Sequence, residues 1–205
     1  PAFPVIGEDL GVDARALGLT LSSFFITFAL GQLVVGPLAD RYGRQKLVLG
    51  GLAIFVVGTV IAGLANTLDT LIAGRVIQAL GVCAASVLSR AIARDLFEGE
   101  ALARALSLTM IATAAAPGFS PLAGSLLSVT LGWRAIFILV GLAAVALAFF
   151  YVRGLGETHP ADRRAPHSAK SVVLAYRRLT RDKRFILPAL SMSLLMSGLF
   201  ASFVA

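Results

Sequence analysis

Long apolar runs separated by short charged segments dominate this chain. Five stretches carry no charge and a sixth carries only that of Arg75: 16–39, 47–68, 105–130, 135–152, 185–205 and, with the arginine, 70–89. Each has about the length that an α-helix needs to cross roughly 30 Å of hydrocarbon. Apolar residues follow one another without the alternation of membrane β-strands. The pattern therefore predicts an all-α, polytopic helical membrane protein.

Composition supports this class. The chain is 58% hydrophobic and 14% charged, whereas soluble domains are about half apolar and a quarter charged. Runs of this number and length exceed what a soluble fold of 205 residues can bury. Cys83 is the single cysteine, and His159 and His167 stand in a polar segment without ligand spacing, so we expect no disulfide and no metal site.

Positive charge is distributed unevenly between alternate loops. The loops 40–46, 90–104 and 153–184 hold 3, 3 and 9 Lys and Arg residues, while the opposite side holds only Arg15 and Arg134. The positive-inside rule then places these three loops in the cytoplasm. The uneven distribution thus identifies the basic residues behind the net charge of +7 as topology determinants, and we expect no nucleic-acid partner. A bacterial inner membrane is the expected location.

The longest polar segment divides the chain. We predict an N-terminal transmembrane lobe over 1–152, a basic cytoplasmic inter-lobe linker over 153–184, and the first span of a second lobe over 185–205. Within the linker, 169–178 is expected to form a short amphipathic helix whose basic face contacts anionic membrane lipid. Because residue 1 is Pro and the last residues are still apolar, we expect a piece of a longer protein.

A charged segment joins the first two complete spans. Gly36 and Gly43 permit tight backbone geometry, and Asp40 lies close in sequence to Arg41 and Arg44. Arginine suits bidentate pairing with a carboxylate. On physical grounds this is a charged hairpin, whose exposed ion pairs would contribute only about 0–1 kcal/mol each.

The spacing of this hairpin resembles the loop signature of the major facilitator superfamily, at eight of the eleven positions from Gly36 to Lys46. The resemblance implies an N-terminal six-span lobe whose first span is largely missing here. It also implies that Gly36, Asp40, Arg41, Gly43 and Arg44, together with Asp95, form a conformational latch that stabilises the outward-facing state.

A second motif surrounds the arginine of the stretch 70–89. At 100° per residue, Arg75 and Gln78 share one helix face with Val82, Ser86 and Ser89. An arginine at span depth costs roughly 2.5–3.5 kcal/mol on insertion scales, so we expect it to face a cavity or a partner rather than lipid. The alternative is an arginine that snorkels to the outer surface.

Arg75, Gln78 and Gly81 resemble the fourth-span motif of drug–proton antiporters, with Ala79 where a glycine is usual. The resemblance implies that Arg75 and Gln78 line the cavity and take part in proton coupling. It places the acidic partner of the arginine just before Pro1.

Two prolines four residues apart interrupt the stretch 105–130. Pro117 and Pro121 remove backbone donors and kink a helix, and the neighbouring Gly118 and Gly124 allow close packing. A plain packing interface is the alternative. The stretch resembles the antiporter motif of span five, in the form found in the Bcr/CflA multidrug-resistance branch.

Further fragments resemble the same branch, including Gly132-Trp133-Arg134, where Trp133 is expected to be an interfacial anchor, and Glu157-Thr158, which ends the first lobe.

The resemblance implies a proton-coupled exporter of drugs or small amphiphiles, with substrate and protons as partners, no obligatory protein partner and no cofactor beyond the proton gradient. Alternatives are a carrier of a sugar, nucleoside or siderophore, or a non-transporting receptor or assembly protein. No nucleophile–base pair or phosphate loop indicates an enzyme or an ATP-driven pump.

Overall fold

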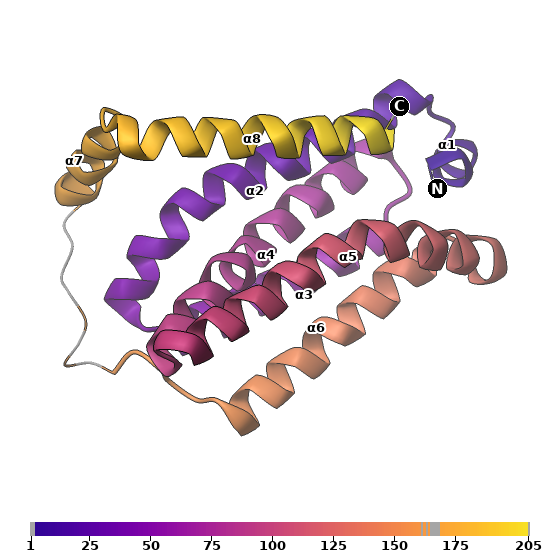
Figure 1. Cartoon of the computed structure of the whole chain (residues 1–205). Helices are drawn as coiled ribbons and strands as arrows, with labels where there is room; N and C mark the ends of the chain where they lie inside the picture. Colours follow the sequence, from indigo (N-terminus) through magenta and orange to yellow (C-terminus); the bar gives the residue numbers. More distant parts are fainter. Residues whose placement is uncertain (1–2, 161, 163, 165–168, 205) are drawn as a thin grey trace. The chain divides into compact units, whose positions relative to one another are not determined.

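The structure, a computed structural model, describes residues 3–160, 162, 164 and 169–204, and within these ranges it contains helices and no strand (Figure 1). The predicted all-α class is therefore confirmed. The chain divides into two compact units, 1–165 and 166–205. The helices of the first unit are α1 (Phe3–Leu10), α2 (Ala14–Tyr42), α3 (Arg44–Gly63), α4 (Leu68–Leu96), α5 (Gly99–Leu131) and α6 (Arg134–Gly154). The second unit contains α7 (Ala169–Leu179) and α8 (Lys183–Val204).

Helices α2 to α6 are each long and apolar enough to cross a membrane. They correspond to the five spans predicted for the first lobe. Helix α8 has 22 residues and occupies the stretch predicted as the first span of a second lobe. Its role as a span stays a prediction, as does the division into lobes and linker.

The helices extend beyond the uncharged stretches. The expected loop 40–46 shortens to Gly43, the single residue between α2 and α3, and most of 90–104 is helical because α4 continues to Leu96. A charged residue avoids the hydrocarbon, but it does not by itself end a helix. Helices end where capping groups or the backbone angles require it. At Gly43 the φ of 96° and ψ of 159° suit glycine alone, and α2 ends there. At the other end, α3 stops at Gly63, before the expected boundary at 68.

Helix α4 lies at the centre of the first unit, packed against α2 and α3. Glycines permit the close approach of α3 and α4. A Cβ on Gly81 would meet the backbone of Phe55 and Gly51, and one on Gly58 would meet the backbone of Gln78. Small residues of this kind let neighbouring spans pack backbone to backbone. These two closely packed helices carry several of the polar side chains that form the networks described below.

Helix α5 differs from its neighbours. Most of its side chains are exposed, and it packs only sparsely against α4 and α6. The helix continues through Pro117 and Pro121. The apolar face of α5 therefore has little packing within the described part of the chain.

Candidate functional site: two polar networks on one helix frame

The first network surrounds Arg44 at the junction of α2 and α3. Its Nη1 donates to Oδ1 of Asp40 at 2.6 Å, and its Nε donates to Oδ2 of Asp95 at 3.2 Å. The Arg44 side chain is only 9% exposed. One planar guanidinium thus joins α2, α3 and the end of α4, as its fixed fork of donors allows.

The beginning of the linker folds back onto the same junction. Oε1 of Glu157 accepts a hydrogen bond from the backbone N–H of Arg44 at 2.8 Å, so a carboxylate caps the N-terminus of α3. No side chain within α3 or at Gly43 performs this task. A Cβ at Gly43 would collide with the side chains of Glu157 and Arg164, which gives the glycine a second reason besides its backbone angles.

Other bonds fasten this segment. Nη2 of Arg164 lies 3.2 Å from Oε2 of Glu157, and Oγ1 of Thr158 donates to Oδ2 of Asp95 at 3.3 Å. Burial of the Glu157 carboxylate disfavours its charge. Hydrogen bonds from the backbone N–H groups of His159, Arg44 and Gln45, with the nearby Arg164 charge, outweigh that effect and hold the pKa of Glu157 below its ordinary value of 4.5.

Two residues of the expected latch lie outside this network. Arg41 is exposed, and its guanidinium lies 5.3 Å from the centre of the Tyr42 ring. Gly36 lies one and a half turns before the helix end, and a Cβ there would meet open space. The structure therefore brings together Asp40, Arg44 and Asp95 around Gly43, while the latch role of the whole set stays a prediction.

The second network surrounds Arg75 on α4. Its Nη1 donates to Oε1 of Gln78 at 2.7 Å, and Nε2 of Gln78 donates to Oγ1 of Thr59 on α3 at 2.8 Å. The Thr59 hydroxyl donates in turn to the carbonyl oxygen of Phe55 at 2.7 Å. Gln78 and Thr59 are 2% and 3% exposed, so this series of hydrogen bonds begins in the buried interface between α3 and α4 and leads outward to Arg75.

The outer side of Arg75 meets an aromatic ring. Its guanidinium carbon lies 4.2 Å from the centre of the Phe24 ring on α2, a cation–π distance, and Phe24 stacks on Phe28. Arg75 forms no ion pair with a carboxylate in the described part of the chain. The guanidinium is held by an amide and a ring, which leaves further N–H donors available.

The remaining motif residues have simpler surroundings. Gln78 and Gly81 lie between α3 and α4. From this interface the Gln78 side chain orients Arg75 by its hydrogen bond, and Gly81 allows the two helices to pack closely. On α5, a Cβ at Gly118 would meet nothing within 4 Å. The predicted kink at Pro117, Gly118, Pro121 and Gly124, and the cavity role of Arg75, Gln78 and Gly81, stay predictions.

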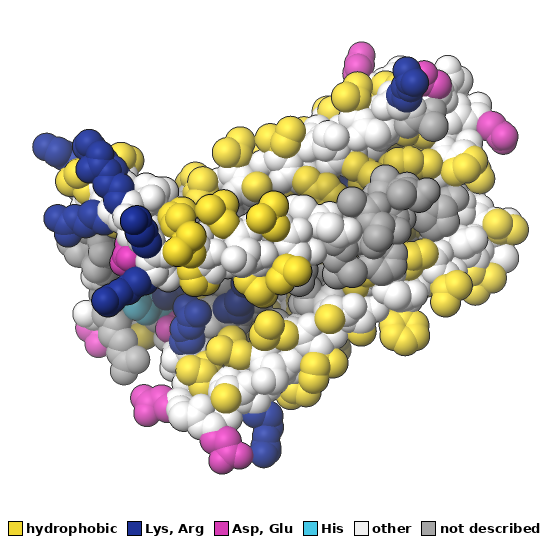
Figure 2. All heavy atoms as spheres, turned by 45° about the horizontal axis from the view of Figure 1, so that its top comes forward, with side chains coloured by type: hydrophobic (Ala, Val, Ile, Leu, Met, Phe, Trp, Pro, Cys, Tyr) yellow, Lys and Arg dark blue, Asp and Glu magenta, His cyan; other side chains and the backbone are white. Residues whose placement is uncertain are grey.

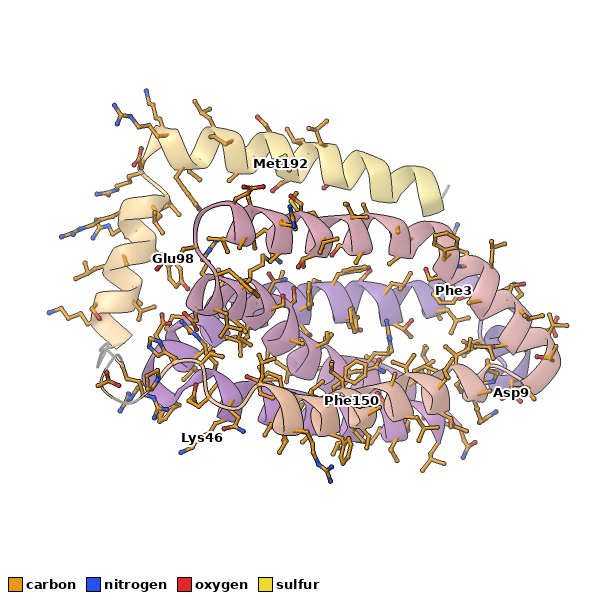
Figure 3. The ribbon with its side chains drawn as sticks, turned by 60° about the horizontal axis from the view of Figure 1, so that its bottom comes forward. Phe3, Asp9, Lys46, Glu98, Phe150 and Met192 are labelled. Atoms are coloured by element: carbon orange, nitrogen blue, oxygen red, sulfur yellow. The ribbon has the colours of Figure 1, made fainter. Side chains whose placement is uncertain are left out.

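A third polar cluster lies at the opposite end of the first unit, where Figure 3 shows Asp9 far from Lys46 and Glu98. Nη1 of Arg134 and Nε1 of Trp133 both donate to Oδ2 of Asp9, at 2.6 and 3.0 Å. Trp133 is only 3% exposed and packs edge-on against Phe137. The indole is thus buried within the protein, where Asp9 satisfies its N–H, and its role as a membrane-interface anchor stays a prediction.

Sequence reasoning missed several members of these networks. Arg164, Thr59 and Phe24 carried no motif signal, and Glu157-Thr158 was noted only as the end of the lobe. Glu157 lies 113 residues from Arg44, so only the fold brings the two together. The one usable signal was the position of Glu157 shortly after the apolar span 135–152, on the membrane face also predicted for the basic loop 40–46.

Comparison with known proteins gives a consistent family. The family model described as Major Facilitator Superfamily matches residues 1–205. An uncharacterized MFS-type transporter of Bacillus subtilis, YdgK, is 34% identical over 203 residues, which cover 98% of this chain and 50% of that protein. The bicyclomycin resistance protein homolog of Haemophilus influenzae is 32% identical over 204 residues, with the same coverage of both chains.

Multidrug resistance protein D of Escherichia coli is 32% identical over 162 residues, which cover 79% of this chain and 41% of that protein. The chain spans about half the length of these relatives, or somewhat less. Among solved structures, the human organic anion transporter MFSD10 has a TM-score of 0.64 at 20% identity, covering 87% of this chain and 45% of that one. This likeness concerns the fold alone.

Proposed function

Because this chain belongs to the major facilitator superfamily, we propose that it forms the N-terminal lobe and the start of the second lobe of a proton-coupled exporter of drugs or small amphiphilic molecules. In such a carrier, substrate binds near the bilayer midplane between two lobes that rock by alternating access. Relatives named for multidrug and bicyclomycin resistance support export of this kind. The five spans and the relatives from Escherichia coli and Haemophilus influenzae make it an integral protein of the inner membrane.

The observation that carries the proposal is the arrangement of Arg75. A guanidinium on a central membrane helix is costly unless it is paired or faces an aqueous cavity. Here Gln78 on the same helix holds it and is itself fixed by Thr59 of α3, and Phe24 flanks it from α2. An arginine fixed in this way lowers the pKa of an approaching carboxyl group by stabilising its charged form. Substrate and proton binding can then compete at one place.

The Arg44 network supplies the conformational part of the mechanism. We propose that Asp40, Arg44 and Asp95 form the latch expected from the sequence, at the cytoplasmic face, and that Glu157 and Arg164 complete it. Glu157 belongs to the segment that leads into the second unit. Any movement of that segment therefore acts directly on the N-terminus of α3.

Proteoliposomes containing the intact protein test the proposal. A pH gradient is imposed, and proton flux is followed with an entrapped pH dye while a panel of neutral and amphiphilic drugs is added. We expect substrate-dependent proton movement that an uncoupler abolishes. Arg75→Ala should reduce it at least tenfold, and Thr59→Val, which removes the support of Gln78, should reduce it less.

The matched control is Arg104→Ala, because Arg104 is an arginine of the same chain whose side chain is 77% exposed. It should leave the flux unchanged. Drug movement that proceeds equally with and without a pH gradient would contradict proton coupling. Equal activity of Arg75→Ala and Arg104→Ala would contradict the role given to Arg75.

A further inference from the structure

Basic residues concentrate on α7 and at its junction with α8. Between 169 and 184 the chain carries six Lys and Arg residues and one acidic residue, Asp182. Figure 2 shows this concentration of Lys and Arg side chains. The six are Lys170, Arg177, Arg178, Arg181, Lys183 and Arg184. Within the described residues none of them forms an ion pair.

The single acid of this segment has another task. Oδ1 of Asp182 accepts a hydrogen bond from the backbone N–H of Arg184 at 2.9 Å, so it caps the N-terminus of α8. Within the described residues it forms no ion pair with the surrounding cations. The excess positive charge of these exposed side chains therefore has no acidic partner among the described residues of this unit and is available to an anionic partner from outside it.

The junction between the two helices is short and hydrogen-bonded. The N–H of Thr180 donates to the carbonyl of Tyr176 at 2.9 Å, and the N–H of Asp182 donates to the carbonyl of Arg178 at 3.1 Å. Only three residues separate the helices. A connection of this length spans about 10 Å at most, so α7 cannot leave the end of α8.

Within this unit the axis of α7 makes a large angle with that of α8, and α7 lies beside the N-terminal end of α8 (Figures 1 and 3). If α8 crosses the bilayer, the short connection keeps α7 beside the membrane surface, where anionic lipid can bind it. At 100° per residue, Val172, Tyr176 and Leu179 fall on one side of α7, and Lys170, Arg177 and Arg178 fall on the other, with Leu174 among them. Val173, at the border, is 64% exposed. A short helix with exposed apolar residues and a basic face suits a headgroup interface.

We propose that α7 and its junction with α8 form a docking surface for anionic phospholipid headgroups of the inner leaflet. Guanidinium groups bind phosphate oxygens by paired, charge-assisted hydrogen bonds. Clustered Lys and Arg beside a membrane helix gain further from the negative surface potential of that leaflet. The surface would hold the start of the second unit at a fixed depth, independently of which substrate the protein carries.

The test uses the intact protein in nanodiscs, either of phosphatidylcholine alone or with a quarter of phosphatidylglycerol. A fluorescent label is attached through Val173→Cys in a background where Cys83, which is buried, and any other cysteine are replaced. Quenching by lipids with a spin label near the headgroup reports contact with the bilayer. We expect strong quenching in the anionic nanodiscs, little in the zwitterionic ones, and loss of the difference in high salt.

The double variant Arg177→Gln with Arg178→Gln keeps good helix formers but removes two charges. Since each basic residue near an anionic surface contributes roughly a factor of five, the preference for the anionic lipid should fall about 30-fold. The matched control, Arg90→Gln with Arg104→Gln, removes two exposed charges from the first unit and should change nothing. Equal quenching in both lipids, or a label shielded in both without salt dependence, would overturn the proposal and indicate a protein contact instead.

Discussion

The two ends of the first unit carry ionic clusters of different design. At the Gly43 end, Arg44 is 9% exposed and binds Asp40 and Asp95 from two further helices. At the opposite end, Arg134 and Asp9 are 40% and 44% exposed and form a single ion pair. Both clusters tie several segments together, yet only the first encloses its arginine.

The difference shows which cluster can serve as a latch. Burial raises the cost of leaving a charge unpaired, so breaking an enclosed network has a large effect and breaking an exposed pair a small one. The Arg44 cluster also includes Glu157, which precedes the second unit, whereas the Asp9 cluster joins only α1, the α3–α4 turn and the start of α6. Four substitutions test this contrast, in order of decreasing effect.

Arg44→Ala should have the largest effect. It leaves Asp40 and Asp95 unpaired at a partly buried junction, and removing one partner of such a network costs about 3 kcal/mol. Thermal unfolding of the purified intact protein measures the loss. Arg44→Lys should recover only part of it, because a lysine cannot bind both carboxylates with one planar group. A melting temperature of Arg44→Ala equal to that of the wild type would contradict the burial argument.

Gly43→Ala should follow. Its φ of 96° and ψ of 159° are unfavourable for any side chain, and a Cβ would displace Glu157 and Arg164, for a total cost of roughly 2 kcal/mol. Gly36→Ala is the control, since a Cβ there meets open space on the same helix. It should be neutral or slightly stabilising. Similar melting temperatures for the two variants would show that the junction does not need glycine.

Glu157→Gln should cost about 1 kcal/mol, as the loss of a helix cap does, and it should change the pH dependence of stability. The lowered pKa of Glu157 means that its contribution is complete above pH 4.5 and is lost as the pH falls through the folded-state value. The stabilities of wild type and variant should therefore converge in acid. A constant difference between pH 7 and pH 3 would refute a charge-dependent cap.

Arg134→Gln should have the smallest effect of the four. Its guanidinium is partly solvated, and glutamine can still donate to the carbonyl of Ala65 or to Asp9. A small decrease in melting temperature that disappears in high salt is expected. If this variant proved as unstable as Arg44→Ala, the contrast between the two ends would be wrong.

Much of the helical framework could be predicted from the sequence, because hydrocarbon thickness fixes the length of each apolar run. The helix ends could not, since they depend on local caps such as Gly43 and Thr67. Hydropathy therefore marks where a span meets water and not where its helix stops. This is why the expected loop 40–46 proved to be almost entirely helical.

The site shows a similar limit. Asp40 and Arg44 lie four residues apart, and Asp95 was expected near them from the motif, so their proximity was foreseeable. Glu157 and Thr59 were not, because each meets its partner through helix packing: Glu157 at Arg44 and Thr59 at Gln78. The same packing explains why Gln78 and Gly81, predicted on a cavity face, lie between α3 and α4.

The most direct test of the latch is the balance between outward- and inward-facing states of the intact protein. Spin labels on the two lobes report this balance through their distance distribution. Asp40→Asn removes one carboxylate from Arg44, and the account predicts about a tenfold shift toward the inward-facing state, with reduced transport. Asp69→Asn, at an exposed position on the opposite end of α4, should leave the distribution unchanged. Distributions and transport identical to wild type in Asp40→Asn would contradict the latch.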